Sequence, residues 1–173
     1  MRLHWQEARA KAIVANGTPL RRSPLALPSP CLKWLCMRSL DDILEEYEFL
    51  DGDERYRLLI ELGRELDPMP DALKTDATKV RGCSASVWVY PMAQEGKDAL
   101  HFLADSNAAI TKGIVALVIS AVQDKPAAQV AQTDITAALA PFDLGNQLSS
   151  NRTQGVPNMI ALIRETAARY AQA

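Results

Sequence analysis

The segment Thr78–Tyr90 most constrains how this chain can fold, because it combines strand-forming residues with a sharp bend. Val80 precedes the bend, and the run Val87–Tyr90 consists of β-branched and aromatic residues, which favour strands. Gly82 lies between them and can adopt a positive φ without steric cost. The pattern predicts a strand, a tight turn and a second strand, with Cys83 at the turn.

The periodicities on either side of this segment predict an α+β fold. Apolar residues recur at helical spacing before and after it, whereas the alternation typical of a strand returns at Leu100–Ala104. Gln94–Lys97 has the composition of a hairpin turn. We expect helices at 39–52, 53–67, 107–122, 126–131, 133–139 and 156–172, and strands at 78–80, 87–90 and 100–104. This order predicts a three-stranded antiparallel meander packed on one side by helices.

The helix expected at 107–122 is apolar over a broad face and should be the buried helix at the centre of the fold. Gly113 lies inside it, where glycine costs about 1 kcal/mol relative to alanine. Such a cost indicates close packing at this position, and we expect the sheet to be the partner. Ser39 and Asp53 supply side-chain oxygens that can cap the first two helices, which should form a helical hairpin.

Residues 1–36 differ in composition from the rest of the chain. Four prolines exclude a continuous helix there, and six Lys and Arg residues precede Met37 against one Glu. An arginine-containing segment that is poor in acids is typical of a transit peptide. Alternatively, Met37 is the initiator and the upstream residues are an artefact of start-codon choice. We expect residues 1–36 to be a disordered or loosely packed extension and residues 37–173 to form one domain.

Composition excludes several classes of function. The body of the chain is acidic, which argues against nucleic acid as a partner. Apolar runs fall well short of the ~20 residues that a membrane span needs. Cys83 is the one cysteine of the body, so a disulfide framework is not expected and a reducing, cytoplasmic location fits. Cys31 and Cys36 lack a second pair of ligands for a zinc site.

A single thiol limits the chemistry that the body can perform. His101 is the one histidine there, and we expect it to face solvent from a strand, so a cysteine–histidine hydrolase is not favoured. One cysteine cannot hold an iron–sulfur cluster. Thiol exchange needs no further catalytic group, and its rate rises with the thiolate fraction. Arg81 and Arg152 are candidates to raise that fraction, while a buried, inert Cys83 is the alternative interpretation.

Three sequence blocks, in this order and at this spacing, resemble the SufE/CsdE family of cysteine desulfuration proteins. They are Val80–Trp88, Ala104–Ile110 with Lys112 and Gly113, and Leu148–Gly155. The resemblance covers roughly residues 40–172 and leaves residues 1–36 outside it. One departure is Asn107, where the family commonly has an acid. The resemblance implies a SufE-like fold, which is similar to that of the IscU-type scaffolds.

The resemblance also implies a sulfur carrier rather than a stand-alone enzyme. Cys83 matches the residue that accepts persulfide sulfur from a SufS/CsdA-like cysteine desulfurase and passes it to a SufBCD-like iron–sulfur assembly scaffold. The chain needs no cofactor of its own, because the pyridoxal phosphate (PLP) resides in the desulfurase. Asp105 and Arg152 match residues that shape the pocket or the docking surface, and Arg81 and Gly82 flank the cysteine.

Two other functions remain open on the sequence alone. The chain could be an accessory module that activates a desulfurase by binding, with Cys83 as a structural residue. It could instead be a redox-sensing or stand-alone thiol enzyme, although the body lacks a second cysteine and a suitable base.

Overall fold

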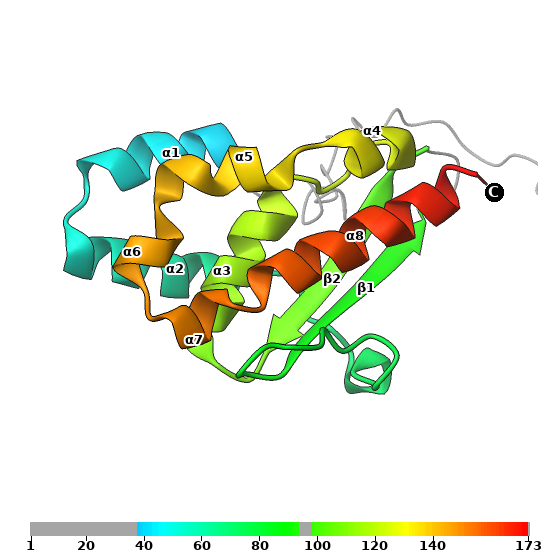
Figure 1. Cartoon of the computed structure of the whole chain (residues 1–173), viewed down its shortest axis with the longest axis horizontal. Helices are drawn as coiled ribbons and strands as arrows, with labels where there is room; N and C mark the ends of the chain where they lie inside the picture. The colour runs from blue at the N-terminus through cyan, green and yellow to red at the C-terminus, as the bar shows by residue number, and fades with distance from the viewer. Residues whose placement is uncertain (1–37, 94–97, 173) are drawn as a thin grey trace, which may run out of the picture. The chain divides into compact units, whose positions relative to one another are not determined.

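The computed structural model describes residues 38–93 and 98–172, which form an α+β fold (Figure 1). The expected extension at residues 1–36 and the expected turn at Gln94–Lys97 lie outside the described residues. The helical elements are α1 (Leu40–Phe49), α2 (Gly52–Glu65), η1 (Asp71–Leu73), α3 (Ala109–Ser120), α4 (Ala127–Gln132), α5 (Ile135–Leu139), η2 (Ala140–Phe142), α6 (Leu144–Gln147), α7 (Ser150–Thr153) and α8 (Val156–Tyr170). The strands are β1 (Val87–Ala93) and β2 (Leu100–Ser106).

The first two helices begin at side-chain caps. The hydroxyl of Ser39 accepts a hydrogen bond from the backbone N–H of Asp42 at 3.1 Å, as the sequence predicts. Helix α2 begins earlier than expected, because Asp51 rather than Asp53 caps it. Asp51 and Glu54 form a reciprocal capping box, which satisfies two backbone N–H groups at the start of the helix.

The expected three-stranded meander is wrong for the part of the chain that the structure describes. Strands β1 and β2 pair antiparallel, but the expected first strand contributes only an isolated bridge between Lys79 and Trp88. A turn closes just before it, where the Thr78 N–H donates to the Thr75 carbonyl oxygen at 3.2 Å. The next turn begins at Arg81, so too few residues remain extended to form a strand.

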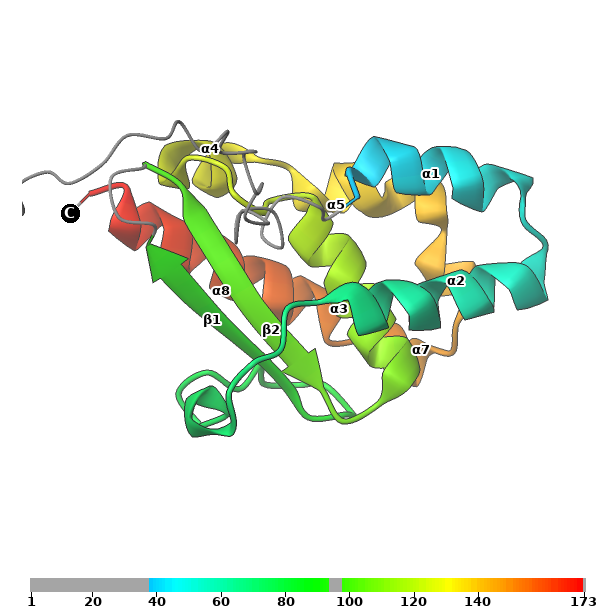
Figure 2. The same cartoon turned by 180° about the vertical axis from the view of Figure 1, so that it is seen from behind.

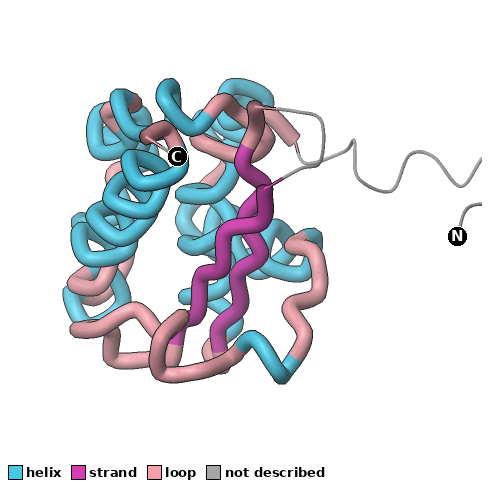
Figure 3. The backbone as a smooth tube through the Cα atoms, turned by 90° about the vertical axis from the view of Figure 1, so that its right-hand side faces the viewer, coloured by secondary structure: helices cyan, strands magenta, loops and turns pink. Residues whose placement is uncertain are grey.

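Helix α3 is the buried centre of the fold, as expected. It packs on β2 and on α2, and α8 packs on β1. Figure 2 shows α8 behind the two strands, and Figure 3 shows it running alongside them. The inward residues of α8 that the sequence predicts, Met159, Ile160, Ile163 and Ala167, are all buried. No helix within residues 38–93 and 98–172 is long and apolar enough to cross a membrane.

Two glycines bring α2 and α3 into backbone contact. A Cβ on Gly113 would collide with the carbonyl oxygen of Leu59, and a Cβ on Gly63 would lie 2.9 Å from the Gly113 nitrogen. The close packing predicted at Gly113 is therefore confirmed, but the element that packs against this glycine is α2 and not the sheet. Helix α3 lies between the two, with its glycine side turned toward α2.

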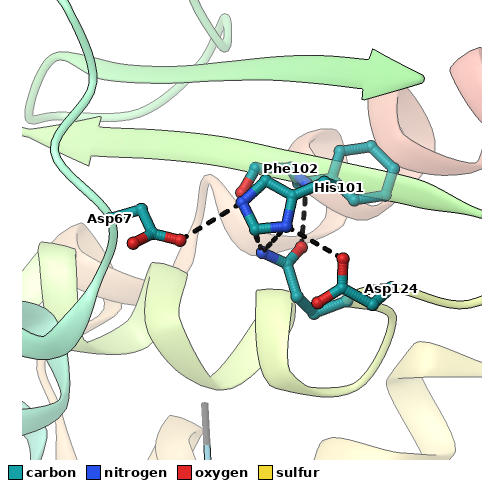
Figure 4. A network of polar contacts seen from close by, with 5 residues as sticks. Asp67, His101, Phe102 and Asp124 are labelled. Carbon is teal, nitrogen blue, oxygen red and sulfur yellow. Dashed lines mark hydrogen bonds and ion pairs between the residues drawn. The ribbon is translucent and has the colours of Figure 1, made fainter. Parts of the chain in front are cut away.

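His101 is buried, which contradicts the expectation that it faces solvent. Its relative exposure is 2%, and its Nε2 and Nδ1 atoms lie 3.2 Å from Asp67 Oδ2 and 2.9 Å from Asp124 Oδ1 (Figure 4). The side chain of Gln123 also covers β2, where its Oε1 accepts from the Phe102 N–H at 2.8 Å. The segments that follow α2 and α3 thus cover His101 and hydrogen-bond to the backbone edge of β2.

Replacing Gly113 with alanine tests the contact between the helices. Alanine favours a helix over glycine by about 1 kcal/mol, but here its methyl group has no space. We expect Gly113→Ala to lower the free energy of unfolding by about 1–3 kcal/mol in urea denaturation, as overpacking does. Gly52→Ala is the control, because a Cβ on Gly52 has no neighbour within 4 Å. Equal stability of the two variants would contradict the contact.

Candidate functional site

The loop Arg81–Ser86 presents Cys83 at the edge of a cavity. Cys83 is half-buried, and Gly82 has φ of +79°, the conformation that the sequence predicts for the glycine of this turn. A cavity of about 360 Å³ adjoins the thiol. Its lining residues are Asp76, Lys79, Val80, Arg81, Gly82 and Cys83. The sulfur atom is therefore sheltered by the fold but not sealed inside the apolar core.

The start of helix α8 packs against Cys83. A Cβ on Gly155, the N-cap residue of α8, would collide with Cys83 Sγ and lie 3.0 Å from Cys83 Cβ. The thiol thus lies directly against the backbone at the start of this helix. Asn158, in the first turn of α8, donates from Nδ2 to the Arg81 carbonyl oxygen at 2.9 Å. Sequence reasoning missed Asn158, and it included Gly155 in a motif without assigning it a role.

Asn107 fixes the other end of the loop. Its Oδ1 accepts from the Ser86 N–H at 3.0 Å, and its own N–H donates to the Ser86 carbonyl oxygen at 3.2 Å. Asn107 is the position at which the resemblance noted in the sequence leads us to expect an acid. An aspartate there would present the same acceptor oxygen to Ser86, so the departure preserves this contact. The sequence signal for this role was an amide side chain directly after a strand.

Asp105 lies at the end of β2 and binds two lysines instead of lining the cavity beside Cys83. Its carboxylate lies 2.8 Å from Lys74 Nζ and 2.8 Å from Lys112 Nζ, and it accepts from the Ser106 N–H at 2.9 Å. Burial opposes ionisation, but these hydrogen bonds outweigh it and lower the pKa of Asp105. The same contact, with a second one to Asp71, raises the pKa of Lys74 to about 12. Asp105 thus links the segment after η1 to α3.

The structure describes the side chain of Arg81 but not that of Arg152. Arg81 is exposed and lines the cavity next to Cys83. Arg152 belongs to α7, two residues before the helix-capping Gln154, and its side chain lies outside the described set. In the sequence, Arg152 lies three residues before Gly155, which contacts the thiol. Of the predicted site residues, the consecutive Arg81, Gly82 and Cys83 line one cavity.

Burial raises the pKa of the Cys83 thiol. Among the described side chains, no cation offsets this effect, and activation of the thiol by Arg81 stays a prediction. The amino end of α8 lies against the sulfur and carries partial positive charge, which favours an anion there. Within the described residues, no cluster of three or more His, Cys, Asp and Glu side chains is arranged to hold a metal ion.

A second cavity of about 400 Å³ continues from the first toward α8. Asp76, Lys79, Val80 and Arg81 line both cavities, and α8 contributes one wall of the second. The lining residues from α8 are Asn158, Ala161, Leu162 and Glu165. The two cavities form a groove that runs from Cys83 along α8, and this groove presents charged side chains of both signs.

Comparisons with known proteins identify relatives of the chain. The family model described as SufE, an Fe-S metabolism associated domain, matches residues 41–167. The chain is 36% identical over 136 residues to an uncharacterized SufE-like protein of Rhizobium etli, and the match covers 77% of this chain and 92% of the relative. It is 38% identical over 105 residues to the sulfur acceptor protein CsdE of Escherichia coli, covering 60% and 70%.

The fold also has a counterpart among solved structures. The solution structure of a hypothetical protein from Thermus thermophilus superposes with a TM-score of 0.63 and covers 78% of this chain and 96% of that protein. The two sequences are 15% identical, so this likeness supports the fold alone.

The raised pKa of Cys83 predicts how its alkylation depends on pH. Only the thiolate reacts with iodoacetamide, so the rate should rise with pH around a midpoint above that of the same chain unfolded in urea. The measurement uses a Cys31→Ser/Cys36→Ser background, so that Cys83 is the reacting thiol. Because the folded state holds the proton more tightly, stability should also fall as pH rises through this range. A midpoint at or below that of the unfolded chain would contradict this account.

Replacing Asp105 with asparagine separates its structural contacts from any part in sulfur chemistry. The variant loses a charged partner for both Lys74 and Lys112, so we expect a lower urea midpoint at neutral pH. The pKa of Asp105 is lowered by folding, so its contribution is present above the unfolded pKa and is lost as pH falls. The difference between wild type and Asp105→Asn should therefore shrink in acid, and a constant difference would argue against the ion pairs.

Proposed function

Because this chain belongs to the SufE family, we propose that it accepts sulfur from a cysteine desulfurase as a persulfide on Cys83. In this proposal it stimulates the desulfurase and passes the sulfur to an iron–sulfur assembly scaffold. The observation that carries the proposal is the position of the thiol, which is half-buried at the edge of a cavity, on a turn with a glycine pivot. The relative from Escherichia coli is named a sulfur acceptor protein.

The transfer itself is thiol–persulfide exchange. The Cys83 thiolate attacks the terminal sulfur of the donor's persulfide, a new S–S bond forms on Cys83, and the donor's S–S bond breaks. The donor cysteine leaves as a thiolate, so one thiolate is consumed and one is released. The sulfane sulfur moves in its existing oxidation state, and no external oxidant or reductant takes part. A second exchange of the same kind delivers the sulfur to the scaffold.

Half-burial gives the carrier both shelter and access. The raised pKa keeps more of the resting thiol protonated and so slows its reaction with electrophiles in solution. The same burial limits attack by solvent reductants on the persulfide. Docking of the donor must therefore favour the thiolate, and the amino end of α8 beside Sγ is positioned to stabilise that charge.

The residues around Cys83 take supporting roles in this proposal. Gly82 supplies the conformation of the turn, and Arg81 offers a cation at the cavity edge that a docked donor can meet. Arg152 contributes to the docking surface near the start of α8. Asp105 acts through the fold, by holding Lys74 and Lys112 near the end of β2.

The proposal assigns the chemistry of sulfur release to the partner. A SufS/CsdA-like desulfurase contains the pyridoxal phosphate, and this chain uses no cofactor of its own and does not turn over alone. The receiving scaffold is of the SufBCD type, and the cytoplasm is the proposed compartment. An accessory module that only binds the desulfurase is the competing function, and the following experiment distinguishes the two.

Intact-mass spectrometry after incubation with desulfurase and cysteine tests the carrier function. We expect the Cys31→Ser/Cys36→Ser chain to gain the mass of one or more sulfur atoms, and this adduct to disappear with a thiol reductant. Adding Cys83→Ser should abolish the adduct and the stimulation of desulfurase turnover, because the acceptor atom is gone. If Cys83→Ser still stimulates turnover fully while forming no adduct, the chain is a binding module with a structural cysteine.

A further inference from the structure

We propose that Asn158 is a positioning residue that holds the Cys83 loop in its sheltered conformation. The proposal takes Cys83 as the sulfur-accepting residue and in that respect rests on the proposed function. Its structural basis is the hydrogen bond from Asn158 Nδ2 to the Arg81 carbonyl oxygen, 2.9 Å long, which joins α8 to the loop just before Gly82 and Cys83.

The two ends of the loop are fixed with unequal strength. At the far end, Ser86 and Asn107 exchange two hydrogen bonds, and β1 follows directly. At the near end, Val80 pairs with Val87 through a backbone hydrogen bond of 2.8 Å. Between these anchors, the bond from Asn158 ties the start of the turn to α8, and it is exposed to solvent. An exposed hydrogen bond of this kind contributes little to global stability but can decide a local conformation.

The packing around Gly82 shows that the amide covers the turn. A Cβ on Gly82 would collide with Asn158 Nδ2, so the side chain of Asn158 lies against the residue that precedes the cysteine. Gly155, three residues before Asn158, lies against Cys83 Sγ in the same way. The start of α8 therefore contacts the thiol and the pivot of its loop together. When the hydrogen bond to the Arg81 carbonyl is broken, rotation about the backbone of Gly82 can move the thiol away from Gly155.

The position of Asn158 also makes its bond accessible to a partner. Asn158 and Arg81 both line the second cavity of the groove, which has a volume of about 400 Å³ and lies along α8. A donor chain in this groove can compete for the Asn158 amide or for the Arg81 carbonyl with its own backbone groups. Binding in the groove would then free the cysteine loop, so that the thiol is presented when the donor is in place.

The test measures how fast Cys83 reacts in variants that cannot donate this hydrogen bond. Asn158→Ala and Asn158→Leu are made in the Cys31→Ser/Cys36→Ser background, and alkylation by iodoacetamide is followed by mass spectrometry at one fixed pH. Glu165→Ala is the matched control, because Glu165 lies on the same helix and lines the same groove, two turns beyond the residue that bonds the loop. Thermal unfolding of each variant reports global stability.

We expect both Asn158 variants to react about three- to tenfold faster than the parent, the range for loss of one exposed hydrogen bond. Their unfolding temperatures and the rate of Glu165→Ala should match the parent. Hydrogen exchange of the peptide that contains residues 81–86 should accelerate in parallel. Unchanged alkylation and exchange would overturn the proposal, and so would an acceleration that only follows a loss of global stability.

The readouts also separate this proposal from the proposed function. If Cys83 gains no sulfur from a desulfurase but the Asn158 variants still alkylate faster, the loop contact stands and the carrier function fails. If sulfur transfer occurs and the variants alkylate at the parental rate, the carrier function stands and the role of Asn158 fails. If both proposals hold, the persulfide on Cys83 of Asn158→Ala should also be lost to a thiol reductant faster than that of the parent.

Discussion

The arrangement of the helices depends on the contact between the backbones of α2 and α3. Gly63 and Gly113 allow this approach, since a side chain at either position would meet backbone atoms of the other helix. The contact fixes α3 at the centre, where β2 packs on another of its sides. It also brings the end of α2 close enough for Asp67 to reach His101 on β2. His101 is thereby buried on a sheet of only two described strands.

The site depends on a different helix. Helix α8 supplies Gly155 beneath the thiol and Asn158 beside the turn, so the cysteine loop is positioned by a segment far from it in sequence. At its other end the loop is fixed by two hydrogen bonds between Ser86, which precedes β1, and Asn107, which follows β2. Burial raises the pKa of Cys83, and the start of α8, a segment distant in sequence, lies against its sulfur atom.

Sequence patterns correctly predicted the features of this structure that depend on neighbouring residues. The positive φ of Gly82, the cap at Ser39 and the inward stripe of α8 follow from residue types within one or two turns. Features that depend on distant segments were missed or misassigned. The partner of Gly113, the burial of His101 and the reduction of the first strand to a bridge all require knowing where other segments cross. The boundary at residue 36 remains a prediction.

Under the proposed function, the short loop around Cys83 limits the distance over which the sulfur can travel. Fixed at both ends, it can shift its thiol only by a small fraction of the span that the same residues would cover in extended form. In the proposed function, Cys83 therefore has almost no reach, so each exchange partner has to extend a segment of its own up to the cavity. The length and flexibility of the partner's segment, and not those of this chain, then set the range of the transfer.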